Sequence, residues 1–170
     1  MNTSILAIAL AGVLLPGMNV APTWHTNYGL AQQQSAAQKK PLVVVFGSGA
    51  NGWSKVIRAE APAPEVAKLL FDNYVCVYVD TANSKGKKIA QDFEISGSVG
   101  VVIGDRKGLT QAFWHQGDLT NDSMRSYLTK YADPHVAVQG TETVNTVRTS
   151  FYPAGSSSQG TMRTMSSGNC

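Results

Sequence analysis

The chain has 170 residues, carries a formal net charge of +3 and is 43% hydrophobic. This length and hydrophobic content suit one domain with additional segments at its ends, and they give no reason to expect two domains. The net charge is small and the basic residues are interleaved with acidic ones, so we expect no nucleic-acid partner. No metal-ligand spacing is present, and neither a metal nor a cofactor is expected.

The beginning of the chain contains no formal charge, because Asp, Glu, Lys and Arg are all absent from residues 1–38. Within it, Ile5–Leu15 is an apolar run as long as a signal-peptide core and too short to span a bilayer as a helix. Residues 1–21 are therefore predicted to be a signal peptide, which places the protein in the periplasm, the cell envelope or the medium. No basic residue precedes the apolar run and Pro22 follows the expected cleavage position, so an uncleaved helix that anchors or packs on the domain is the alternative.

The next segments alternate between helical and extended patterns. Trp24, Tyr28 and Ala31 recur at helical spacing and predict a helix over Thr23–Gln38. The run Pro41–Phe46 is apolar and β-branched, which is typical of a strand covered on both faces. The later predicted elements are a broken helix over Trp53–Asp72, a strand over Tyr74–Asp80, a helix over Ser84–Phe93, a hairpin over Val99–His115 and a helix over Asn121–Tyr131.

The end of the chain has weaker patterns. An extra strand through Val136 and Val138 is the only regular element that residues 134–152 suggest. Residues 153–170 are rich in Ser, Gly and Thr, a composition typical of a disordered tail.

The two cysteines lie in different contexts. Cys76 falls inside a buried strand pattern, so we expect it to act as an inert, small hydrophobic side chain. Cys170 is the last residue and is available for a disulfide between two copies of the chain.

The order of elements, and the stretch from Trp24 to about Asp133 in particular, resembles exported bacterial thioredoxin-like domains. The similar stretches are W-x3-Y-x2-A before KKPLVVVF, then PEVAKLLFDNYVCVYVD, and the DRKG turn followed by Gly117. The resemblance implies an α/β fold with three layers, α/β/α, and a mixed central sheet that ends in an antiparallel hairpin. It assigns residues 22–133 to the thioredoxin-like domain.

Two departures from the family separate this chain from its redox-active members. Where those members carry Cys-x-x-Cys, this chain reads Asn51-Gly52-Trp53-Ser54-Lys55, and thiol-disulfide exchange needs both an attacking thiolate and a resolving thiol. Where they carry a cis proline, this chain has Val99, which is expected to be trans. No catalytic residue is therefore predicted, and Ser54 is expected to cap a helix rather than act as a nucleophile.

In related folds an extended peptide pairs with the backbone near the cis-proline position, so the resemblance implies a peptide- or protein-binding module. Trp53 is expected to lie exposed at the lip of a glycine-rich turn, as an anchor for the partner. The predicted binding residues are Gly49, Asn51, Gly52, Trp53, Ser54, Lys55, Ser98 and Val99.

Two other functions remain open. Residues 47–52 read G-x-G-x-x-G between a predicted strand and helix, which suggests a nucleotide-binding protein or enzyme with Asp80 on a ribose hydroxyl. Against this, Asp80 lies 28 residues after Gly52, and Pro62 and Pro64 break the intervening helix. A structural envelope protein linked through its tail and Cys170 is the third hypothesis.

Overall fold

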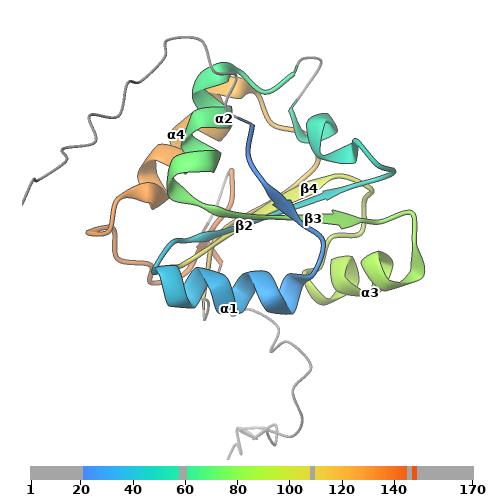
Figure 1. Cartoon of the computed structure of the whole chain (residues 1–170), viewed down its shortest axis with the longest axis horizontal. Helices are drawn as coiled ribbons and strands as arrows, with labels where there is room; N and C mark the ends of the chain where they lie inside the picture. The colour runs from blue at the N-terminus through green and yellow to red at the C-terminus, as the bar shows by residue number, and fades with distance from the viewer. Residues whose placement is uncertain (1–20, 58–60, 108–109, 145–146, 149–170) are drawn as a thin grey trace, which may run out of the picture.

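A computed structural model of the chain describes residues 21–57, 61–107, 110–144 and 147–148. The apolar run of the predicted signal peptide, the predicted disordered tail and Cys170 lie outside these residues. The described residues form one sheet with helices packed on both of its faces (Figure 1).

The sheet is mixed, and its strand order is β1-β3-β2-β4-β5-β6-β7. The strands are β1 Trp24–His25, β2 Leu42–Gly47, β3 Val75–Asp80, β4 Gly100–Gly104, β5 Gln111–Gln116, β6 Thr141–Glu142 and β7 Val147–Arg148. Strand β2 lies in the middle, parallel to β3 and antiparallel to β4. Strands β4 and β5 form the predicted hairpin.

The helices make the two outer layers of the molecule. They are α1 Tyr28–Gln38, α2 Pro64–Asn73, α3 Ser84–Asp92 and α4 Asn121–Ala132, with a short 3-10 helix, η1, over Gly52–Val56. Helices α1 and α3 cover one face of the sheet, and α2 and α4 cover the other (Figure 1). This is the predicted three-layer α/β/α arrangement. None of the helices in the described part of the chain is long and apolar enough to cross a membrane.

The core consists of two clusters separated by the sheet. All six residues of β2 are buried, as expected for a continuous apolar run in a central strand. Because side chains alternate along a strand, Val43 and Val45 enter the cluster under α2 and α4, whereas Val44 and Phe46 enter the cluster over α1 and α3. Side chains also alternate along β5: Phe113 stacks with His115 on one face, and Trp114 packs on the other.

The predicted helix over Thr23–Gln38 is wrong at its start. Trp24 and His25 form β1, which pairs in parallel with Cys76 and Val77 of β3. The helix begins only after Asn27, whose side chain accepts a hydrogen bond of 3.2 Å from the Leu30 N–H and caps it.

The predicted strand through Val136 and Val138 is also misplaced. Neither residue lies in a strand, and the sheet instead continues past the hairpin through β6 and β7. The Thr141 hydroxyl donates to the Gln111 carbonyl at 3.0 Å, and Glu142 accepts from the Tyr131 hydroxyl at 2.6 Å. The first contact holds β6 beside β5, and the second holds it to α4. Neither polar contact could be predicted from an apolar pattern.

Candidate functional site

The glycine loop, residues 47–52, connects the end of β2 to η1. Gly49 has a φ of +83°, a conformation that favours glycine. A Cβ on Gly47 would lie 2.5 Å from the backbone of Gly52, and a Cβ on Gly52 would overlap the Tyr78 hydroxyl. Tight packing therefore explains the glycines at positions 47 and 52, and the backbone conformation explains Gly49.

Two side chains at the end of β3 hold this loop. The Asp80 carboxylate accepts hydrogen bonds of 2.9 Å from the N–H groups of both Gly49 and Ala82. The Tyr78 hydroxyl donates to the Gly49 carbonyl at 2.5 Å. The hydrogen bonds from Ala82 and Gly49 hold the pKa of Asp80 below its ordinary value.

This geometry disfavours the nucleotide-binding alternative. Asp80, expected on a ribose hydroxyl, binds the glycine loop instead, and its negative charge beside the Gly49 N–H opposes a phosphate there. The loop also leads into the five-residue 3-10 helix η1 rather than a long α-helix, which begins only at Pro64.

The predicted binding residues at the end of the loop and in η1 differ in exposure. Asn51 and Lys55 are exposed, Ser54 is half-buried and Gly52 is buried. The prediction that Ser54 caps a helix is wrong, because its hydroxyl donates to the Asn51 carbonyl at 2.9 Å within η1. Asn51 is the residue at the cap position, and it makes no side-chain cap hydrogen bond.

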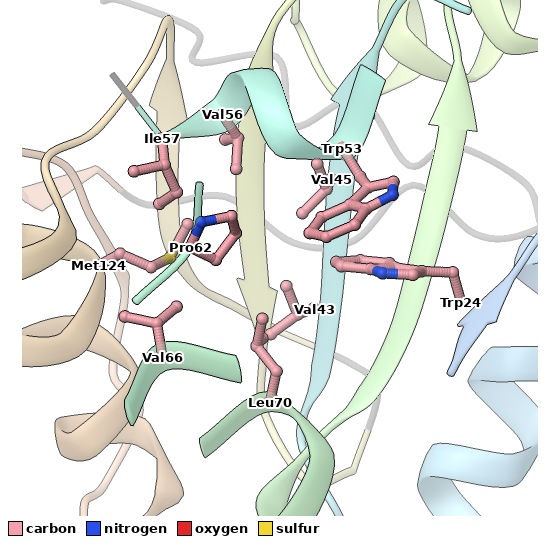
Figure 2. Close-up of a pocket in the computed structure, with 10 residues that line it drawn as sticks. All are labelled: Trp24, Val43, Val45, Trp53, Val56, Ile57, Pro62, Val66, Leu70 and Met124. Atoms are coloured by element: carbon pink, nitrogen blue, oxygen red, sulfur yellow. The ribbon is translucent and has the colours of Figure 1, made fainter. Parts of the chain in front are cut away.

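Trp53 is less accessible than predicted. Its indole packs against that of Trp24, with ring centroids 5.4 Å apart and an angle of 30° between the planes. Figure 2 shows the two indoles one above the other beside an apolar cavity that is also lined by Val45 and Pro62. The cavity measures about 10 Å³, no more than the space of one water molecule, so it cannot admit a peptide side chain. Trp53 can offer a partner only the part of its ring that stays accessible.

The second part of the predicted binding site, Ser98 and Val99, lies just before β4. Ser98 is exposed, and Val99 is half-buried against the α2 and α4 cluster. All peptide bonds of the described residues are trans, which confirms the prediction for Val99. The Val99 carbonyl accepts from the Gly117 N–H at 2.9 Å, and the Gln116 side chain accepts from the Ser96 N–H at 3.2 Å. These two contacts fix the segment against β5.

Thr81 joins the two predicted segments, and the sequence analysis missed it. Its hydroxyl lies 2.9 Å from the Gly47 carbonyl and 3.3 Å from the Ser98 carbonyl, and its N–H donates to the same Gly47 carbonyl at 2.7 Å. Thr81 therefore brings the base of the glycine loop next to Ser98. Its position directly after a buried strand was the only sequence signal, and it does not reveal such a contact.

Cys76 lies at the start of β3, at the opposite end of that strand from the glycine loop. It is 2% exposed, and burial raises the pKa of its thiol to about 12. Its buried position agrees with the sequence prediction. Among the described residues no group of three His, Cys, Asp or Glu side chains is placed to hold a metal ion.

The chain was compared with protein-family models, curated proteins and solved structures. No protein-family model and no curated protein matches the chain. A thioredoxin from Thermus thermophilus is similar in structure, with 17% identity and a TM-score of 0.52 over 64% of this chain and 85% of that chain. A DsbH oxidoreductase is similar with 15% identity and a TM-score of 0.51 over 77% and 94%. At these identities the likeness establishes the fold: this chain has an α/β thioredoxin-like fold.

Proposed function

We propose that this protein is an exported, redox-inactive thioredoxin-like domain that binds an extended peptide. The binding surface comprises the exposed parts of residues 49–55 and the segment 97–99. The observation that carries the proposal is the position of Thr81, whose hydroxyl holds the exposed Ser98 segment beside the glycine loop. Thr81 thereby brings Ser98 next to the base of the glycine loop, although the two are far apart in the sequence.

Redox inactivity is supported by the residues available for thiol chemistry. Asn51 and Ser54 stand where the resemblance places the two reactive thiols. The Cys76 thiol is buried and neutral at physiological pH, so it is a poor nucleophile. In an assay of insulin reduction by dithiothreitol, we expect the full chain to leave the rate unchanged, with a thioredoxin as positive control. An acceleration would refute this part of the proposal.

Peptide binding is supported by the backbone at Ser98. This residue lies before the start of β4, beyond the part of the strand that pairs with β2 and β5. An extended peptide that pairs with backbone here would gain main-chain hydrogen bonds, and neighbouring side chains would provide selectivity. The contacts of Thr81 and Gln116 keep this backbone in place before a partner arrives, which lowers the entropic cost of binding.

The test is a selection on the immobilised full chain from a phage-displayed library of random octapeptides. One enriched peptide is then synthesised and titrated into ¹⁵N-labelled protein. We expect the largest resonance shifts at the amides of Gly97 and Ser98 and at the Trp53 indole N–H. The absence of any enriched peptide, or shifts confined to α4 and β6, would refute peptide binding at this surface.

Export has a separate test, because it depends on residues 1–21 alone. We expect a fusion of these residues to a β-lactamase that lacks its own signal to confer ampicillin resistance on a bacterial host. Mass spectrometry of the full chain from the same host then reports whether the segment is removed. Sensitivity to ampicillin would contradict export by this segment.

A further inference from the structure

A surface groove of about 440 Å³ lies directly beside Ser98. Its apolar floor is formed by Ala90 of α3 and by Ile95, both almost completely buried. Gly97, Ser98 and the exposed Lys87 of α3 also line it. Unlike the cavity beside Trp24 and Trp53, this groove is large enough to receive a peptide side chain.

The groove and the Trp53 surface lie on different sides of the segment 97–99. Ala90 and Ile95 belong to the cluster over α1 and α3, whereas Trp53 and Val99 pack against the cluster under α2 and α4. Successive side chains of an extended strand point to opposite faces. A peptide paired at Ser98 would therefore direct every second side chain into the groove and the others toward Trp53.

The charge of the groove indicates which side chains it accepts. Lys87 is the only charged residue among the described residues that line it, and Lys87 is exposed. Lys85 and Lys88 lie in the same helix, which ends at Asp92, and neither lines the groove. An apolar floor beside an ammonium group complements an apolar side chain next to a carboxylate.

We propose that the groove selects peptides in which an apolar side chain and an acidic side chain, two positions apart, face α3. The apolar side chain lies on Ala90 and Ile95, and the acidic side chain pairs with Lys87. This inference rests on the proposed peptide-binding function and names the class of peptide that it takes.

The experiment repeats the octapeptide selection on three full-length proteins: wild type, Lys87→Glu and Lys88→Glu. Lys88→Glu is the matched control, since it makes the same charge change on the same helix at an exposed position that does not line the groove. We expect wild type and Lys88→Glu to enrich peptides with an apolar and an acidic residue two positions apart. Lys87→Glu is expected to enrich lysine or arginine at the acidic position.

The selected acidic peptide and its lysine-substituted copy are then compared by fluorescence anisotropy at low ionic strength. Because Lys87 is exposed, we expect a preference of about fivefold for the acidic peptide, reduced by salt and reversed by Lys87→Glu. Enrichment without an acidic preference, or an equal change with Lys88→Glu, would overturn the groove proposal and leave peptide binding intact. Failure to enrich any peptide would overturn both.

Discussion

Gly52 shows how closely the backbone of the candidate site is packed. A Cβ at this position would overlap the Tyr78 hydroxyl, so either the loop or the tyrosine must move in Gly52→Ala. Overpacking of this kind costs about 1–3 kcal/mol. We expect urea unfolding, followed by circular dichroism, to show a loss of stability in this range.

Gly29→Ala is the matched control for that substitution. A Cβ on Gly29 in α1 meets no atom closer than 3.7 Å, an ordinary contact distance, and alanine favours the helix. We expect a gain of about 0.5–1 kcal/mol in the same experiment. Equal effects of the two substitutions would show that the close approach of Gly52 to Tyr78 does not determine the change in stability.

Asp80 makes the stability of the glycine loop depend on pH. Its pKa is lower in the folded protein than its ordinary value of 3.8, because the Ala82 and Gly49 amides donate to the carboxylate. The stabilisation is thus complete above about pH 4 and is lost as the pH falls through the folded-state pKa. We expect wild type to be more stable than Asp80→Asn at pH 6, with a smaller difference at pH 3. A difference independent of pH would contradict this assignment.

At the scale of elements, Arg106 in the hairpin turn joins two helices on opposite faces of the sheet. Its guanidinium donates to the carbonyls of Lys39, which follows α1, and of Ala132, the last residue of α4. A cation is favourable at helix C-termini, and both hydrogen bonds are lost in Arg106→Gln.

We expect Arg106→Gln to lower the free energy of unfolding by about 1–2 kcal/mol, because the site is only partly buried. Lys107→Gln removes a neighbouring exposed charge and should change stability by less than about 0.5 kcal/mol. Thermal melts of both variants test the prediction. If they melt alike, Arg106 does not connect the helices energetically.

At the scale of the whole molecule, the two apolar clusters share the strands that separate them. We therefore expect them to unfold together, although they occupy opposite faces. Trp114 reports on the α1 and α3 side, and Trp24 and Trp53 report on the other side. Phe46→Leu alters the α1 and α3 side. It should shift the urea midpoints of both fluorescence reporters equally. The midpoints are measured in one variant that retains only Trp114 and in another that retains only Trp24 and Trp53. Separate midpoints would show two independent units.

The sequence alone determined the interior elements and the fold class. The run Pro41–Phe46 is continuously apolar, which predicts a strand covered on both faces, and the strand is buried throughout. The burial of Cys76 was predicted for the same reason. Burial of apolar side chains is a local property of the sequence, so local patterns predict it.

Tertiary structure decided the parts that depend on contacts between residues distant in the sequence. The pairing of Trp24 with Cys76, the stacking of Trp24 on Trp53 and the attachment of β6 by Thr141 carry no periodic signal. The same holds for the candidate site, where the Thr81 hydroxyl reaches Gly47 and Ser98 from another element. A single hydrogen bond of this kind depends on where three separate segments lie in space, and only the folded chain specifies that.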